Sequence, residues 1–422
     1  MNKLAQVFTT KSLRDKILFT IFILIIFRIL AHITIPGADI EKIRFLLENK
    51  GQNALGIFSL LTGGAMENFS IILMGLTPYI NASIILQLLT VIVPSLENLK
   101  KEGEQGQKKI SQYTRLLTVP LAFVQSYGMM TLINKYSPGI VDTTDAAVIL
   151  PMMLMVTAGT VVLIWLGELI TEKGIGNGIS LLIFAGIVST VPQQIAGAFQ
   201  SSSAPVILGL VVATILLTTF VVYVSEGERR VPVIYASKKS SATQKSFLPL
   251  KINQAGMIPI IFAISLVSFP SILAQFFIQS ESATLQKIAE MSIEFFNPAS
   301  PGLYYNILYA LLIFGFTYFY VSLVFEPKKI ADNIQKRSGF IPGYRPGKET
   351  EKFLEITTNR LCFWGGSFLA FVAIFPLIFT NWLGSGVALF ISGAGIIIVV
   401  SVVLDLIRRI NAQLVMQDYD KL

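Results

Sequence analysis

The chain has 422 residues, of which 53% are hydrophobic and only 14% are charged, whereas about 25% of the residues of an average soluble protein are charged. Its mean hydropathy is +0.67. A single cysteine, Cys362, and a single histidine, His32, leave no intramolecular disulfide and no histidine–cysteine metal cluster within this sequence. These values exclude a soluble enzyme and predict a membrane protein that crosses the bilayer several times.

Long apolar blocks predict membrane-spanning helices. The stretches Gly174–Ser225 and Leu361–Leu404 contain 52 and 44 residues without a charge, and each has room for two spans because one span needs about 20 apolar residues. Runs of this length indicate helices rather than the short alternating strands of a barrel. We therefore predict an all-α membrane protein with ten transmembrane helices, at residues 17–35, 70–93, 116–134, 147–167, 179–198, 205–225, 255–278, 303–325, 361–380 and 387–404.

Lysine and arginine are distributed unevenly over the predicted loops. If the N-terminus is cytoplasmic, the cytoplasmic segments carry 27 of the 33 basic residues and the external loops carry five, while Arg28 lies within a span. Basic residues accumulate in the cytoplasmic loops of membrane proteins, so we predict that both termini are cytoplasmic. The net charge of +8, which could suggest a nucleic-acid or anionic-lipid partner, is then mostly a topology signal.

The predicted spans lack the groups that couple transport to an ion gradient. Nine of them have no charged residue, and the tenth has only Arg28, one helical turn before His32, a pair that we interpret as an anchor near the outer interface. The run G-Y-R-P-G-K-E from Gly343 departs from a phosphate-binding loop, and G-I-G-N-G from Gly174 follows no strand. The protein is therefore predicted to be passive or to take its energy from a partner.

The external stretch 54–64 is apolar but too short to cross a bilayer. At 1.5 Å per residue, about ten residues reach across only half of the hydrocarbon core. The segment must therefore lie at the interface or fold back into a cavity, and folding back is allowed only where protein or water surrounds it.

Breaks and pairs of isoleucines mark two of the predicted spans. Gly75 and Pro78 predict a break within the second span, and Ile80 and Ile84 follow it at a helical spacing of four. The fifth span repeats this spacing at residues 183 and 187. Taken alone, such pairs indicate ordinary helix packing.

Two predicted cytoplasmic segments are longer than topology requires. Segment 226–254 contains two β-like runs around a polar turn, which predicts a projecting hairpin. Segment 326–360 carries eight basic residues, and its tip is stiffened by glycine and proline. Loops of this length usually have a functional role, such as binding.

Six motifs in order resemble the SecY family, the channel subunits of the Sec protein translocon. They are T-P-Y-I-N-A-S-I-I from Thr77, K-K-E-G-E-Q-G-Q-K-K-I-S-Q-Y-T-R from Lys100, G-I-G-N-G-I-S from Gly174, E-R-R-V-P-V from Glu228, L-P-L-K-I-N-Q-A-G-M-I-P from Leu248 and F-I-P-G-Y-R-P-G from Phe340. The resemblance covers essentially the whole chain. It implies a channel that translocates unfolded secretory polypeptides and releases transmembrane segments sideways into lipid.

The resemblance also implies an architecture of two inverted, pseudo-symmetric halves of five helices. The N-terminal half would be residues 1–200 with the plug segment 54–64, and the C-terminal half would be residues 201–422 with the cytoplasmic loops 226–254 and 326–360. The family's aliphatic pore ring and its plug would fall on matching positions. The ring is Ile80, Ile84, Ile183, Ile187, Ile261 and Ile398, and the plug is Gly56, Ile57, Phe58, Ser59, Leu60, Leu61 and Thr62.

The remaining site residues and the partners follow from the same resemblance. Polar residues of the lateral gate would be Gln87, Gln125 and Asn253, and the docking arginines would be Arg229, Arg230 and Arg345. The expected partners are the small subunits SecE and SecG, the motor ATPase SecA, the ribosome, signal sequences with their nascent polypeptides, and membrane lipid. The expected location is the bacterial inner membrane, with no cofactor, no metal and no enzymatic activity.

Two other classes of function compete with this interpretation. A small-solute secondary transporter would need ion-coupling groups, which the spans lack. An enzyme acting within the bilayer would need a metal site or a nucleophile with its base, and the sequence has no such constellation. A passive protein-conducting channel is therefore the function that the sequence favours.

Overall fold

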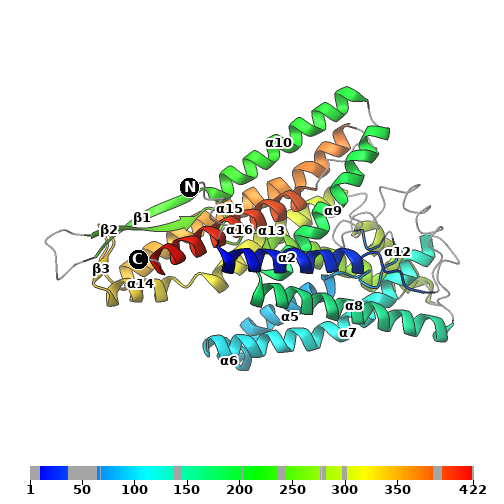
Figure 1. Ribbon diagram of the computed structural model, residues 1–422, viewed down its shortest axis with the longest axis horizontal. Coiled ribbons are helices and arrows are strands. Elements are labelled where there is room, and N and C mark those ends of the chain that lie inside the picture. The colour runs from blue at the N-terminus through cyan, green and yellow to red at the C-terminus, as the bar shows by residue number, and fades with distance from the viewer. Residues whose placement is uncertain are drawn as a thin grey trace. The chain divides into compact units, whose positions relative to one another are not determined.

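The computed structural model is helical apart from one small sheet (Figure 1). It describes residues 10–36, 64–66, 68–136, 145–201, 203–235, 244–275, 277, 282–296, 302–383 and 392–420. Its elements in chain order are α2 (Lys11–Leu30), α5 (Thr77–Ile92), α6 (Pro94–Lys101), α7 (Glu104–Tyr136), α8 (Ala146–Lys173), α9 (Gly178–Ser201), α10 (Ala204–Glu226), β1 (Glu228–Tyr235), β2 (Gln244–Lys251), α11 (Ile258–Gln275), α12 (Ala283–Phe295), α13 (Leu303–Val324), α14 (Pro327–Lys336), β3 (Gly339–Phe340), α15 (Lys348–Leu383) and α16 (Gly393–Asp420).

Each of the ten predicted spans overlaps one of the described helices. By length and composition, five of the described helices could cross a membrane, and six could if the bent pair α5 and α6 forms one span. The α2 and α16 helices carry several charges each, at Arg14, Asp15, Lys16 and Arg28 in α2 and around Asp405 in α16. The chain is therefore a multi-pass membrane protein, while the number of ten spans stays a prediction.

The second predicted span is helical over only part of its length. Residues 71–76 form turns, Gly75 has a φ of +54°, and α5 begins at Thr77 with Pro78 in its first turn. Proline is favoured there because the first N–H groups of a helix have no intrahelical partner. The predicted break is confirmed, and it lies at the start of the helix instead of in its middle.

The chain packs into two compact units. The first contains residues 1–202, 264–305 and 402–422, and the second contains residues 203–263 and 306–401. These units follow packing, whereas the predicted halves 1–200 and 201–422 follow an internal repeat, so the halves stay a prediction.

The core of the first unit joins the end of α2 to the start of α5, with α7 and α8 beside them. Its buried side chains include Ile35, Phe69, Met130 and Val156, which come from four different parts of the chain. The α7 and α8 helices lie side by side (Figure 1) and are tied by an ion pair between Arg115 and Glu168, with Nε and Oε1 3.1 Å apart.

A glycine-rich turn connects α8 to α9 at the motif G-I-G-N-G. Gly176 has a φ of +89°, which side chains other than hydrogen disfavour, and Gly178 packs so closely on α8 that a Cβ atom there would lie 1.8 Å from the carbonyl oxygen of Gly167. The N–H of Gly178 donates to Thr171 Oγ1 at 2.8 Å, and the N–H of Ile175 donates to Thr20 Oγ1 at 3.2 Å. The motif thus fixes the point at which α9 starts.

The second unit contains the three-stranded sheet, in the order β2-β1-β3. β1 pairs antiparallel with β2, with Val231 opposite Leu248, and β1 also pairs antiparallel with β3, with Ile234 opposite Phe340. The predicted hairpin in segment 226–254 is confirmed by this pairing. Val231, Val233 and Leu250 pack with residues of α14 and α15 in one buried cluster, so the hairpin and the basic segment 326–360 form one folded body.

We predict that Gly178→Ala destabilises the protein by at least about 2 kcal/mol, because the added methyl group overlaps the Gly167 carbonyl of a rigid neighbouring helix. The thermal melting temperature of the purified protein in detergent measures this loss. Gly197→Ala is the matched control on the same helix, since no atom of another described segment lies within 4 Å of its Cβ position. It should melt at or slightly above the wild-type temperature, because alanine favours helix. Equal melting temperatures for both variants would contradict the close approach.

Candidate functional site

The six predicted ring isoleucines share one structural feature: each lies within the first three turns of its helix. Those helices, α5, α9, α11 and α16, begin at Thr77, Gly178, Ile258 and Gly393. Four of the isoleucine side chains are buried, and two are half-buried. The buried ones are Ile84, Ile183, Ile187 and Ile398, and the half-buried ones are Ile80 and Ile261.

The first unit carries four of these isoleucines, two on α5 and two on α9. The turn at Gly178 sets the position of Ile183 and Ile187 by holding the start of α9 against α8. Ile179 lies one turn before Ile183, and its Cδ1 would be 2.7 Å from a Cβ atom placed on Gly167. Ile179 is therefore a packing residue between α8 and α9.

The second unit carries Ile261 and Ile398. The start of α16 is held as closely as the start of α9, because a Cβ atom on Gly393 would lie 2.0 Å from the carbonyl oxygen of Val372 on α15. Ser392 caps this start by accepting a hydrogen bond from the N–H of Gly395 at 3.1 Å. The meeting of all six isoleucines around one axis stays a prediction.

The predicted plug, Gly56 to Thr62, lies outside the described residues, but the two chain segments that flank it are described. They meet at a bridge between Thr34 and Ser70. Ser70 Oγ donates to the carbonyl oxygen of Leu30 at 2.8 Å, and Asn68 Nδ2 donates to that of Ala31 at 3.4 Å. The described residues on the two sides of this segment are therefore held together by contacts that hydropathy does not reveal.

The three predicted gate residues differ in their hydrogen bonding. Gln87 is half-buried, and its Nε2 donates to Ser83 Oγ on the same helix at 3.1 Å. Asn253 is buried, and its Oδ1 accepts from the N–H of Gly256 at 2.9 Å. Gln125 is only 2% exposed, and neither its Nε2 nor its Oε1 has a hydrogen-bond partner in the described part of the chain. Burying an amide without hydrogen-bond partners costs free energy, so Gln125 is the least stably placed of the three gate residues.

The predicted docking arginines lie on different surfaces of the second unit. Successive residues of a strand point to opposite faces, so Arg229 shares the face of the buried Val231 while Arg230 shares the open face with Phe247. Both arginines are exposed, and Arg230 Nε pairs with Glu228 Oε1 at 2.7 Å. The two neighbours therefore present their charges in different directions.

Arg345 lies in the turn between β3 and α15, bounded by two glycines with positive φ, Gly343 and Gly347. Its backbone N–H donates to Glu349 Oε2 at 3.0 Å, and its carbonyl oxygen accepts from Thr350 Oγ1 at 2.9 Å. These bonds use the backbone of Arg345, so the turn is held without its exposed side chain. The strand β3 beside it, only two residues long, gives no signal in the sequence.

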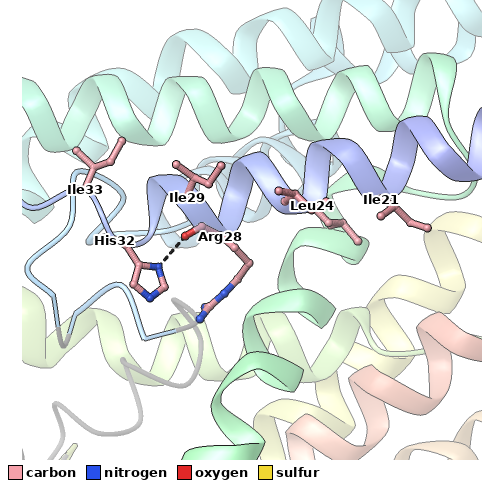
Figure 2. A pocket seen from close by; sticks show the side chains of 7 residues that line it. Ile21, Leu24, Arg28, Ile29, His32 and Ile33 are labelled. Atoms are coloured by element: carbon pink, nitrogen blue, oxygen red, sulfur yellow. Dashed lines mark hydrogen bonds between the residues drawn. The ribbon is translucent and has the colours of Figure 1, made fainter.

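The Arg28–His32 pair lies at one end of an open hollow on α2 (Figure 2). The hollow has a volume of about 670 Å³, and apart from these two residues its lining is aliphatic. His32 Nδ1 lies 2.8 Å from the carbonyl oxygen of Arg28, so this nitrogen carries the proton because a carbonyl oxygen only accepts. Among the described residues, no group of three or more His, Cys, Asp or Glu side chains could hold a metal ion.

Comparison with known proteins identifies the family. The family model named SecY matches residues 70–407. The chain is 40% identical to the protein translocase subunit SecY of Halalkalibacterium halodurans, over 99% of this chain and 98% of that protein. It is 41% identical to the protein translocase subunit SecY of Staphylococcus epidermidis, over 98% of this chain and 97% of that protein.

Solved channel structures share the fold. A SecY translocation channel whose plug domain stabilises the closed state matches with a TM-score of 0.65 at 19% identity, over 94% of this chain and 92% of that one. Sec61 in the canine ribosome–channel complex from the endoplasmic reticulum matches with a TM-score of 0.62 at 18% identity and the same coverage. The family match, the near-complete alignment with its relatives and the shared fold lead to one conclusion: this chain belongs to the SecY family of protein translocase channel subunits, a family of pores and not of enzymes.

Proposed function

We propose that this chain is the protein-conducting channel of a bacterial Sec translocon, and that unfolded secretory polypeptides pass through it while transmembrane segments leave it sideways into lipid. The observation that carries the proposal is the full-length relation to protein translocase subunits. The chain would lie in the inner membrane with ten spans and both termini in the cytoplasm, which the uneven distribution of its basic residues supports.

Two inverted halves would form the channel, and matching features at the helix starts support this repeat. In the second and seventh predicted spans the helix begins three residues before the ring position, from Thr77 to Ile80 and from Ile258 to Ile261. In the fifth and tenth it begins five residues before, at Gly178 and at Gly393.

Both of these glycines also pack against a carbonyl oxygen of the preceding span. A repeat of five helices per half would place such equivalent positions on opposite sides of a central pore.

The six isoleucines would form the constriction of this pore. Branched side chains are stiff at χ1, and a narrow apolar throat excludes ions because water leaves it. The ring offers no hydrogen bonds, so it would not hold a passing peptide of any particular sequence. A segment 54–64 seated against the ring would complete the seal, and the bridge between Thr34 and Ser70 would keep this segment beside the pore.

The lateral gate would be held by few polar contacts. Hydrogen bonds between membrane helices contribute only about 0.6–2 kcal/mol, and Gln125 has none in the described part of the chain. A signal sequence that adds its own burial in lipid would therefore be enough to open the gate. Residues Gln87, Gln125 and Asn253 are the proposed polar contacts.

The folded body made of the hairpin and segment 326–360 would be the docking surface for the partner that drives transport. Its exposed arginines suit both candidates, because a guanidinium binds the carboxylates of a motor such as SecA and the RNA phosphates of a ribosome. The fold neighbour Sec61 is found in a ribosome–channel complex, which supports the ribosome as one partner. The small subunits SecE and SecG would complete the translocon.

We predict that Ile183→Asn raises the resting ion conductance and relaxes the demand for a strong signal sequence. Replacing a buried isoleucine by a polar residue costs about 2–4 kcal/mol of stability, and we expect this cost to fall mainly on the closed state of the ring. Ile179→Asn is the control, because Ile179 packs against α8 and should lose stability without leaking. Single-channel recordings and melting temperatures of both variants test this. A destabilised but ion-tight Ile183→Asn channel would show that the ring is assigned wrongly.

Deletion of residues 56–62 should leave a folded channel with a raised resting conductance, because the seal on one side of the ring is lost. The bridge between Thr34 and Ser70 lies outside the deletion, so the packing of α2 against the start of α5 should survive. Planar-bilayer conductance, together with the melting temperature, measures both effects. If conductance stays at the wild-type level, the segment is an interfacial helix and not a plug.

Arg345→Glu should abolish protein transport without loss of stability, because only the backbone of Arg345 holds its turn. Lys348→Glu is the matched control: it makes the same change of charge three residues away, at the first position of α15, and should transport normally. Translocation of a secretory protein into vesicles measures the difference. Normal transport by the Arg345 variant would remove this residue from the docking surface.

A further inference from the structure

The short helix α12 between α11 and α13 has no role in the proposed channel, yet its surface is divided into three distinct faces. Ala289 is buried, and Ser292 and Ile293 beside it are half-buried, so this face packs against the protein. A second face is charged and exposed. The third face is apolar and exposed, and it consists of Leu285, Ile288, Met291 and Phe295.

The spacing of these residues makes the apolar face continuous. Steps of three, three and four residues keep the four side chains on one side of a helix. Met291 is 64% exposed and Ile288 is 57% exposed, which is high for large apolar side chains on a surface in contact with water. The charged face, about a third of a turn around the helix from the apolar face, carries Lys287, Glu290 and Glu294, with Gln286 Nε2 donating to Glu290 Oε1 at 3.4 Å.

Aromatic contacts and a hydrogen bond fix α12 to the ends of the two neighbouring helices. The Phe295 ring stacks on Tyr304 at the start of α13, with ring centroids 5.9 Å apart. At the other side, Ser271 Oγ of α11 donates to the carbonyl oxygen of Phe296 at 3.1 Å. Aromatic side chains gather at membrane–water interfaces because they have an apolar body and a polar edge.

The exposed apolar face of α12 meets the start of α13 in the same unit, because Phe295 of this face stacks on Tyr304. Leu303 and Tyr304 at the start of α13 are themselves exposed. On a multi-pass membrane protein, exposed apolar side chains on such helices face lipid. The α13 helix belongs to the segment Leu303–Lys336, which is long and apolar enough to cross a membrane, so the apolar face of α12 adjoins the end of a helix that we expect to face lipid.

We propose that α12 lies in the plane of the membrane interface and inserts Leu285, Ile288, Met291 and Phe295 between the lipids of one leaflet. The occupant of this face is the bilayer, because Phe295 joins it to Tyr304 at the start of the candidate membrane span α13 and the charged residues of α12 lie on a different face. The charged side has one lysine and two glutamates, so it offers no attraction to anionic lipid. Insertion thus depends on apolar burial alone, and it should be insensitive to salt and to lipid charge.

Depth-dependent fluorescence quenching in the full-length protein tests this proposal. The only cysteine, Cys362, is buried, and Cys362→Ser gives a background for single cysteines. Ile288→Cys and Met291→Cys would be labelled with an environment-sensitive fluorophore, and Lys287→Cys and Glu290→Cys are the matched controls one residue away on the charged face. Each protein is reconstituted in phosphatidylcholine vesicles with and without lipid that carries a nitroxide high on its acyl chain.

We expect the label at positions 288 and 291 to lose more than about half of its fluorescence with nitroxide lipid, and the label at 287 and 290 to lose little. Addition of phosphatidylglycerol or of salt should not change this pattern. Quenching of positions 288 and 291 by aqueous iodide would show a face in water and overturn the proposal. Shielding of both positions from lipid and from iodide would also overturn it, since a protein partner or a second copy would then cover the face.

Discussion

The bilayer supplies no hydrogen bonds to a backbone, and the rest of this structure follows from that constraint. Helices satisfy their own N–H and C=O groups, whereas each interruption leaves N–H groups that need another partner. Side chains accept from such N–H groups at four interruptions, Ser70 and Ser392 within predicted spans and Thr171 and Asn253 in predicted cytoplasmic segments. Each interruption comes just before a helix that carries predicted ring isoleucines. The positions where the backbone leaves the helical pattern therefore set where the helices with the predicted ring isoleucines begin.

Hydropathy and charge predicted much of the fold, because span length and loop charge are local properties of the chain. All ten predicted ranges overlap helices, and the hairpin at residues 228–251 is confirmed. The break at Gly75 was predicted, but the turns over residues 71–74 before it were missed, because an apolar turn and an apolar helix have the same hydropathy. The strand β3 was missed for another reason: two residues become a strand only through pairing with β1.

The residues of the candidate site were predicted from sequence motifs, and not from residue spacing, hydropathy or charge. Isoleucines four residues apart, such as Ile183 and Ile187, indicate only packing until the helix start before them is known. Residue type and helical spacing alone do not distinguish Ile179, which packs on Gly167, from Ile183 one turn later. The opposite directions of Arg229 and Arg230 also required the register of the sheet. The motifs nominate candidate residues, and the tertiary contacts show which of them pack, which are exposed and which are hydrogen-bonded.

The sheet β2-β1-β3 has a mechanical consequence. β1 follows α10 after the single residue Gly227, the N–H of Ile252 after β2 donates to the Gly227 carbonyl oxygen at 2.9 Å, and β3 leads through a short turn into α15. The hairpin and the segment with Arg345 are packed together. A force on either of them therefore acts on one folded body instead of on two separate loops. A motor that grips either surface would transmit its stroke to several membrane helices at once, with little work lost in bending the linkers.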